Sequence, residues 1–181
     1  MTSLAYPDPE LGDATIRLRK WSLGDLACIA EASEDPRIPE GTTVPAAYED
    51  DAGRAFIERQ WSRLDNGEGI SLAIESVARG GAVGLVVLML RPQAGVAGLG
   101  YWVIGSARGN GYATRAVGLL SEWALDGVGI KRVEAWVEPG NEASLRVLEA
   151  SGFELEGRLR SFLAFSTRRA DALVLARIAT A

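Results

Sequence analysis

The segment SARGNGYATRA, residues 106–116, holds the clearest chemical signal in the sequence. Gly109 and Gly111 are two residues apart, Arg108 precedes them, and a stretch with helical apolar spacing follows. A glycine-rich turn that runs into a helix presents unpaired backbone N–H groups and the positive end of the helix dipole, and both favour phosphate groups. The spacing therefore predicts a pyrophosphate-binding loop at residues 108–114.

Two other phosphate-binding patterns fit less well. A dinucleotide-binding turn has the spacing G-x-G-x-x-G directly after a strand, but Thr114 stands where the third glycine belongs. Glu138, at the end of the next predicted strand, is in place for a ribose-binding acid, yet no second β-α-β half follows it. A P-loop requires Gly-Lys-Ser/Thr, which the sequence lacks. The dinucleotide interpretation stays open as a disfavoured alternative.

The residue types that are missing exclude several reactions. The 181 residues include no histidine and one cysteine, Cys28. This excludes Ser/His/Asp and Cys/His relays, a disulfide framework and a Cys/His zinc site, and we expect no metal. Cys28 lies among apolar residues at helical spacing, so we expect it to pack in the core. Catalysis must then use carboxylates, hydroxyls, amines or backbone groups.

The charge balance argues against nucleic acid and membrane partners. The chain has 24 acidic and 19 basic residues, a net charge of −5, and its basic residues are scattered. No nucleic-acid partner is expected from this pattern. No apolar run approaches the length of a membrane span, and the first residues lack a signal-peptide pattern. We therefore expect a soluble, cytoplasmic protein with small-molecule partners, and a homodimer stays open.

The periodicity of apolar residues predicts an α/β fold. Alternation and turn signals predict strands at 15–19, 70–76, 82–91, 98–104, 131–137, 153–159 and 169–178. Helical spacing predicts helices at 22–34, 49–65, 113–127 and 142–151, with Ser22 and Asp25 as a capping box and 35–46 as loop. The result is a single domain over 15–181 after an N-terminal extension at 1–14. Its mixed sheet of about seven strands combines an antiparallel meander with a central parallel pair, and four helices cover it.

At the glycine-rich loop the chain resembles the GNAT superfamily of N-acetyltransferases. The family's cofactor loop has Arg or Gln, two residues, Gly, one residue, then Gly or Ala, which here are Arg108, Gly111 and Ala113. The preceding GYWV and the later NEASLRVLEASGFELEG resemble the RimJ/RimL-type branch, which acetylates the amino termini of ribosomal proteins. The order of elements fits the family over nearly the whole chain.

The resemblance implies a site for acetyl-CoA as co-substrate. In the family the two central parallel strands, here 99–104 and 131–137, splay apart, and pantetheine hydrogen-bonds along the first of them. The loop at 108–114 would take the pyrophosphate. The residues implied in binding the cofactor are Trp102, Val103, Ile104, Arg108, Gly109, Asn110, Gly111, Tyr112, Ala113, Thr114, Asn141 and Ser144. The rings of Trp102, Trp123 and Trp136 are expected to pack against the sheet and helices.

The implied reaction moves acetyl from acetyl-CoA to a primary amine, either a protein or peptide amino terminus or a small amine, by direct attack on the thioester. The backbone N–H of Val103 or Ile104 is the implied oxyanion donor, and Ser144 is a tentative acid for the departing thiolate. Asn141 is also a favoured helix N-cap. An acyl-CoA-binding or regulatory module without catalysis is the alternative.

The general base has no clear counterpart. Many relatives carry a glutamate in a context like AELGYW, where this chain has AGLGYW and Gly98 takes its place. The remaining acidic candidates, all expected to be exposed strand charges, are Glu75, Glu134, Glu154 and Glu156. The resemblance also places the region between the first two helices beside the acceptor, which implicates Arg37, Glu40, Tyr48 and Trp61.

Overall fold

The computed structural model describes residues 4–179, which form one mixed sheet with helices on both faces. The sheet has eight strands in the order β1-β2-β3-β4-β5-β6-β8-β7. Every neighbouring pair is antiparallel except β5 and β6. The strands are β1 (Leu11–Gly12), β2 (Ile16–Arg19), β3 (Gly69–Ser76), β4 (Gly81–Leu90), β5 (Val96–Val103), β6 (Arg132–Val137), β7 (Glu154–Ala164) and β8 (Arg169–Ile178).

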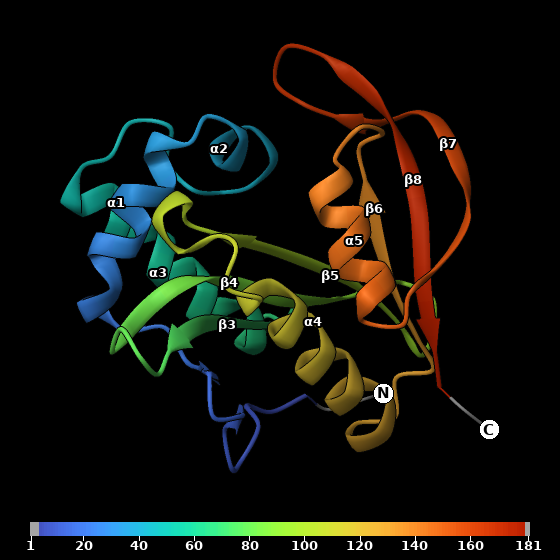
Figure 1. Ribbon diagram of the computed structural model, residues 1–181, viewed down its shortest axis with the longest axis horizontal. Helices are drawn as coiled ribbons and strands as arrows, with labels where there is room; N and C mark the ends of the chain where they lie inside the picture. The colour runs from blue at the N-terminus through green and yellow to red at the C-terminus, as the bar shows by residue number, and fades with distance from the viewer. Residues whose placement is uncertain (1–3, 180–181) are drawn as a thin grey trace.

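The helices divide between the two faces of the sheet. They are α1 (Leu26–Glu34), α2 (Arg37–Gly41), α3 (Asp50–Asp65), α4 (Tyr112–Glu122) and α5 (Glu142–Ala150). Helices α4 and α5 lie on one face, and α1 and α3 cover the other face over the N-terminal strands (Figure 1). Over β6, β8 and β7 this second face carries no helix of the described chain (Figure 1). Large side chains stay partly exposed there, including Trp136 and Phe162.

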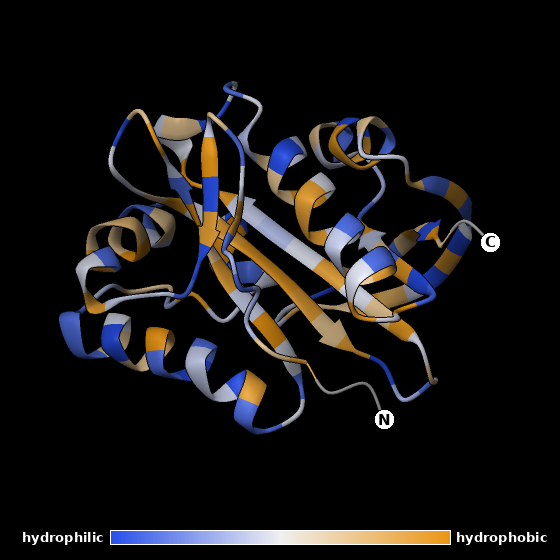
Figure 2. Cartoon of the chain, turned by 90° about the horizontal axis from the view of Figure 1, so that it is seen from below, coloured by the Kyte–Doolittle hydropathy of each residue, from blue (hydrophilic) through white to orange (hydrophobic). Residues whose placement is uncertain are grey.

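The hydrophobic core follows the strands, as the colouring of Figure 2 shows. The Trp21 ring packs 5.7 Å from Phe56 and 6.1 Å from Trp102, measured between ring centroids, so it joins α3 to β5. Cys28 is only 5% exposed, which confirms its predicted core position. Burial raises the pKa of its thiol well above the usual range, so this cysteine is not a ready nucleophile.

The predicted α/β mixed sheet is confirmed, with one more strand and one more helix than expected. The additional strand, β1, is two residues long and pairs with β2. It lies inside the stretch expected to be an extension, and two residues carry no readable periodicity. The additional helix, α2, is a single turn within the expected loop at 35–46. It includes Pro39, a residue that ordinarily marks a loop but is tolerated in the first turn of a helix.

The predicted capping box is also confirmed. The Ser22 hydroxyl accepts a hydrogen bond from the Gly24 amide at 3.1 Å, and the Asp25 carboxylate accepts one from the Ser22 amide at 2.9 Å. The box opens a short 3₁₀ turn, Leu23–Asp25, that leads into α1. Asp25 also holds Arg19 through two hydrogen bonds, so the start of α1 is fixed to β2.

The parallel pair at the centre of the sheet is joined over a short length only. Val96, Ala97 and Gly98 of β5 pair with Arg132, Val133 and Glu134 of β6. From Leu99 onward β5 has a partner on the β4 side alone. Because the two strands separate there, the sheet opens between their carboxyl ends.

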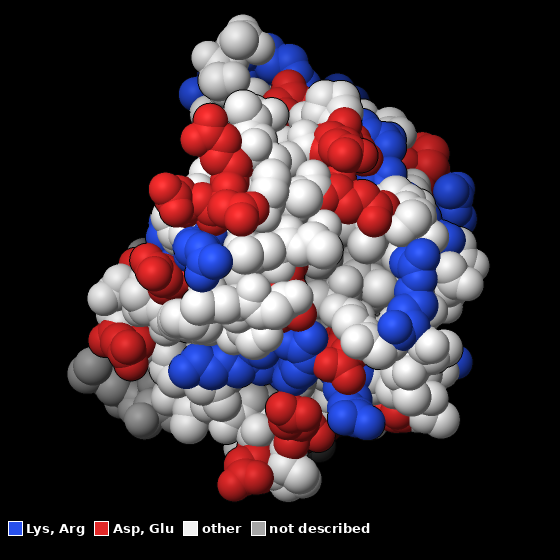
Figure 3. Space-filling model, turned by 90° about the vertical axis from the view of Figure 1, so that its left-hand side faces the viewer, with Lys and Arg blue, Asp and Glu red and all other residues white. Residues whose placement is uncertain are grey.

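The surface carries charges of both signs in close alternation. On the side of the molecule shown in Figure 3, acidic and basic side chains lie in separate small groups beside one another. Within residues 4–179, no helix combines the length and apolar composition needed to cross a bilayer.

Candidate functional site

The separation of β5 and β6 opens into a cleft of about 1050 Å³. Four parts of the chain line it: β5 with the loop that follows it, the amino-terminal turns of α4 and α5, the end of β6, and α2 with the β7–β8 turn. Most of the residues expected to bind a cofactor therefore lie around one cavity. In the described part of the chain, no group of three His, Cys, Asp or Glu residues is placed to hold a metal ion.

The loop before α4 presents a series of unused backbone donors. Gly109 and Gly111 have φ of 80° and 73°, which is the left-handed region where glycine is favoured. Within residues 4–179, none of the backbone N–H groups of residues 109–114 donates a hydrogen bond. Exposed N–H groups at a helix amino terminus bind anions such as phosphate. The loop therefore has the donors that a pyrophosphate needs.

Arg108 holds this loop in place through contacts with β5 and with the turn before α2. Its Nε donates to the Val103 carbonyl at 3.0 Å, and its Nη2 lies 2.7 Å from the Asp35 carboxylate. The same loop is held to α1 by Glu31, whose carboxylate accepts from the Ser106 amide at 2.8 Å and the Ser106 hydroxyl at 3.0 Å. The loop is thus anchored to α1 and to the turn before α2.

Two side chains of the predicted set are held by hydrogen bonds within the protein. The Asn110 amide donates to the Ala107 carbonyl at 3.0 Å, which closes the loop on itself. The Tyr112 hydroxyl lies 3.0 Å from Ser76 Oγ and is buried. These residues offer their backbone N–H groups to a ligand, while their side chains stabilise the turn. Ala113 and Thr114 follow on α4 and also line the cleft.

The free edge of β5 distinguishes the two oxyanion donors that the resemblance implied. The Ile104 N–H donates to the Val83 carbonyl at 3.0 Å, so it belongs to the sheet and is not available. The N–H groups of successive residues point to opposite sides of a strand. The Val103 N–H therefore points into the gap between β5 and β6. The Trp102 ring packs in the core on Trp21, and Trp102 also lines the cleft.

Three polar side chains meet at the first turn of α5, two from the turn itself and one from β5. Asn141 caps the helix, and its side-chain oxygen accepts from the Ser144 amide at 3.2 Å. Ser144 lines the cleft, and its hydroxyl makes no hydrogen bond within the described residues. The Tyr101 hydroxyl crosses from β5 and donates to the Ser144 carbonyl at 3.2 Å. Burial raises the pKa of Tyr101 to about 12, so the phenol keeps its proton at neutral pH.

The carboxylates considered as a base are engaged or remote. Glu75 is held by Arg19, Glu156 by Arg132, and Glu134 lies 3.3 Å from Arg91 and 3.4 Å from Arg132. None of these residues, nor the exposed Glu154, lines the cleft. A Cβ placed on Gly98 would lie 2.4 Å from Arg91 Nη2, so a side chain there would have to displace the Arg91 guanidinium.

Two of the four residues proposed to border the acceptor do line the cleft. Arg37 and Glu40 are on α2 at its rim, whereas Tyr48 and Trp61 do not line it. Trp61 instead donates from its indole nitrogen to the Trp21 carbonyl at 2.7 Å. Tyr48 donates to Asp50 at 3.0 Å.

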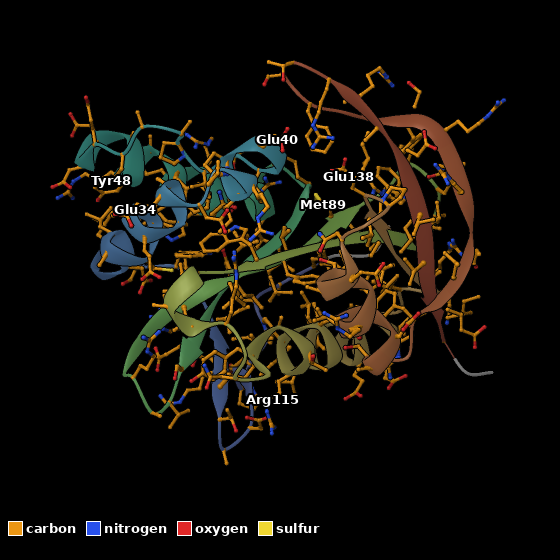
Figure 4. All side chains as sticks on the ribbon, turned by 45° about the horizontal axis from the view of Figure 1, so that its top comes forward. Glu34, Glu40, Tyr48, Met89, Arg115 and Glu138 are labelled. Carbon is orange, nitrogen blue, oxygen red and sulfur yellow. The ribbon has the colours of Figure 1, made fainter. Side chains whose placement is uncertain are left out.

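Sequence reasoning missed the charged bridge at this rim. Arg168, in the β7–β8 turn, binds the carboxylates of both Glu40 and Glu138, and Figure 4 shows these two glutamates near each other. The hydrogen bond with Arg168 lowers the pKa of Glu40 below its usual value. These partners are far apart in the sequence, so no local pattern pointed to them.

Comparison with known proteins places the chain in a family. The family model described as an acetyltransferase (GNAT) domain matches residues 15–154. The chain is 32% identical over 115 residues to the probable N-acetyltransferase YjcK of Bacillus subtilis (strain 168), a match that covers 62% of this chain and 64% of the relative. It thus spans less than two thirds of the length of that relative.

Solved structures share the whole architecture. RimJ of Mycobacterium smegmatis, in complex with CoA-disulfide, superposes with a TM-score of 0.78 at 25% identity, covering 91% of this chain and 82% of that one. The microcin C7 self-immunity acetyltransferase MccE, in complex with acetyl-CoA and AMP, has the same fold at a TM-score of 0.79 and 22% identity, covering 92% and 93%. With the family model matched over most of its length, the chain belongs to the GNAT acetyltransferase family.

Proposed function

We propose that this protein transfers an acetyl group from acetyl-CoA to a primary amine. The observation that carries the proposal is the series of unused N–H groups at residues 109–114, at the mouth of a cleft that runs along the free edge of β5. The free N–H groups of residues 109–114 suit a pyrophosphate. The free edge of β5 offers backbone hydrogen bonds to an extended arm that contains amides. RimJ and MccE, which share the fold, were solved with CoA or acetyl-CoA.

In the proposed reaction a neutral amine attacks the thioester carbonyl directly. The Val103 N–H donates to the oxygen that becomes negative. When the tetrahedral species collapses, the carbon–sulfur bond breaks and the thiolate takes a proton from water, or from the Ser144 hydroxyl, which regains a proton from solvent. The amine loses its proton to solvent. No covalent enzyme intermediate is required, which agrees with a chain that has no histidine and a buried cysteine.

The acceptor is proposed to be an α-amine, at a peptide amino terminus or on a small molecule. Of the three glutamates that line the cleft, Glu40 and Glu138 are bound to Arg168, and Glu142 is exposed on the first turn of α5. An α-amine has a pKa near 8 and is partly neutral without a base, whereas a lysine amine has a pKa near 10.4.

The test combines binding and turnover. Calorimetry should show acetyl-CoA binding to the purified protein, and a thiol-release assay across a panel of amines should show CoA formation that depends on the amine. Binding without turnover on any amine would support the acyl-CoA-binding module instead. No binding at all would refute the assignment of the loop.

A further inference from the structure

Arg91, just after β4, lies in an unusual environment on the sheet face that α4 and α5 leave free. Its guanidinium carbon is 3.9 Å from the centroid of the Trp136 ring, and its Nε is 3.3 Å from the Glu134 carboxylate. Its side chain is only 22% exposed. Trp136 itself lines the cleft, so the stacked guanidinium adjoins the cavity.

The N–H groups of this guanidinium are unused. Arginine carries five of them, and within residues 4–179 Arg91 donates none in a hydrogen bond, since its contact with Glu134 lacks the required geometry. Arg19 and Arg132, whose side chains are as little exposed, each donate to carboxylates. The ion pair with Glu134 and the stacking on Trp136 offset part of the lost hydration, but the Nη groups of Arg91 make no hydrogen bond within the described residues, so they are free to donate to a ligand.

The backbone makes room for this arrangement at one residue. An ideal Cβ at Gly98 would lie 2.4 Å from Nη2, 2.7 Å from Cζ and 2.9 Å from Nε of Arg91. Any side chain at residue 98 would therefore displace the guanidinium. Gly98 and Arg91 act together: the glycine leaves the space, and the guanidinium that fills it is paired with Glu134.

The local charges favour a carboxylate over a phosphate. The neighbouring cation, Arg132, is already bound to Glu156, with contacts of 2.7 and 2.5 Å. One guanidinium is thus available, and Glu134 stands beside it. A single stacked arginine fork matches a singly charged carboxylate in bidentate geometry. A doubly charged phosphate would meet repulsion from Glu134 without a second cation to offset it.

The distance between Gly98 and Val103 along β5 sets the size of an acceptor that places its amine at Val103 and a carboxylate at Arg91. Gly98 and Val103 are five residues apart on one strand, which corresponds to roughly 17 Å at about 3.4 Å per residue. A free amino acid cannot reach from one to the other, because its amine and carboxylate are too close together. An extended peptide covers roughly 3.3 Å per residue, so an acidic side chain about three or four residues from the amino terminus spans the interval.

We propose that Arg91 binds an acidic side chain of the acceptor, and that the acceptor is a peptide or protein amino terminus with Asp or Glu near its third or fourth residue. This inference rests on the acetyl transfer proposed above and adds the class of substrate to it. Arg91 is then a specificity-determining residue, and Gly98 is the residue that permits it.

The experiment uses pairs of peptides that differ by Glu or Gln at one of residues two to six. Acetylation by the wild type should favour the Glu peptide by at least tenfold in kcat/KM when the acidic residue is third or fourth. Arg91→Gln should reduce this preference to less than twofold. Arg146→Gln, which removes an exposed arginine outside the cleft lining, is the matched control and should retain the preference.

Gly98→Ala provides a second variant, because its methyl group would displace the guanidinium without changing charge. It should lose the preference as Arg91→Gln does. Arg132 remains beside Glu134 in both variants, so neither leaves that carboxylate without a partner. Equal rates for the paired peptides in the wild type, or an undiminished preference in Arg91→Gln, would overturn the proposal.

Peptide binding measured in the presence of CoA keeps this test separate from that of the activity. If no peptide is acetylated but the Glu peptide binds at least tenfold tighter than the Gln peptide, and only when Arg91 is present, the carboxylate site stands and the proposed activity fails. If peptides are acetylated with no effect of Glu or of Arg91, the activity stands and the carboxylate site fails.

Discussion

The guanidinium of Arg108 lies 2.7 Å from the carboxylate of Asp35, and this contact connects the loop at 108–114 to the turn between α1 and α2. Arg108 also donates to the Val103 carbonyl on β5 at 3.0 Å. One side chain therefore positions both parts of the candidate cofactor site, the loop with its free N–H groups and the strand edge that faces the cleft. The geometry gives Arg108 a role in shaping the loop, whether or not it also contacts a phosphate.

Arg108→Glu should weaken acetyl-CoA binding at least tenfold. The new carboxylate would repel both Asp35 and the phosphates, and the contact with Val103 would be lost. Calorimetry on the folded variant measures the effect, with circular dichroism as the check on folding. Asp35→Asn is the control, since it breaks the same ion pair but keeps the arginine charge, and its loss should be smaller. Unchanged affinity in folded Arg108→Glu would refute the assignment.

The same pair should make stability depend on pH. Partial burial acts to raise the pKa of Asp35, but its hydrogen bonds with Arg108 and Arg37 outweigh this and hold the pKa below its usual value. A carboxyl whose pKa is lowered by folding stabilises the protein above its unfolded pKa of about 3.9 and loses this contribution as the pH falls through the folded pKa. The difference in unfolding free energy between wild type and Asp35→Asn should therefore be present at pH 6 and shrink below about pH 4. A difference that persisted undiminished at low pH would contradict the ion pair.

The Tyr101 phenol should make the protein less stable as the pH rises into the alkaline range. Its pKa is raised by burial to about 12, so folding favours the protonated phenol. That contribution is present below the unfolded pKa of about 10 and is lost as the pH rises through the folded value. Wild type should lose stability between pH 10 and 12 more steeply than Tyr101→Phe in denaturant titrations. Parallel curves for the two proteins would show that the phenol is not shielded as the structure indicates.

Ser144→Ala should reduce turnover more than binding. If the hydroxyl protonates the thiolate, its loss should lower kcat by about 100-fold, while the acetyl-CoA dissociation constant stays within a few fold. Asn141→Ala is the comparison for structural damage, because removing an N-cap costs about 1 kcal/mol of stability. A full rate in Ser144→Ala on a confirmed substrate would discard the acid role.

Local patterns predicted most of the fold. The predicted bounds of the strand at 169–178 and of the helix at 49–65 agree with β8 and α3 to within one residue, because alternation and helical spacing persist over their full length. Strand β7 extends to Ala164, beyond the predicted end at 159, since bulges between Leu155 and Gly157 and between Leu159 and Leu163 interrupt its alternation. A β-bulge shifts the alternation of side chains between the two faces, so a search for strict alternation does not find the full strand.

The candidate cofactor loop could be proposed from the sequence because its residues are contiguous, whereas the contacts on the proposed acceptor side could not. Arg168 meets Glu40 across 128 residues, and Arg91 meets Gly98 and Trp136 only through the register of β4, β5 and β6. Tyr101 reaches Ser144 through the packing of α5 on the sheet. Such contacts depend on tertiary pairing, which a single sequence without an alignment does not reveal.

The most direct test of the account is the pH profile of acetyl transfer with two acceptors of different basicity. The account holds that a neutral amine attacks without an enzyme carboxylate as base, since residue 98 is glycine and the cleft glutamates Glu40 and Glu138 are bound to Arg168. With a peptide α-amine, the rate of thiol release should rise to an inflection at roughly pH 8, and with a lysine side-chain amine the inflection should move to roughly pH 10, following the acceptor. A fixed inflection at about pH 6 to 7 for both acceptors would contradict the account, because it would reveal an enzyme carboxylate acting as general base.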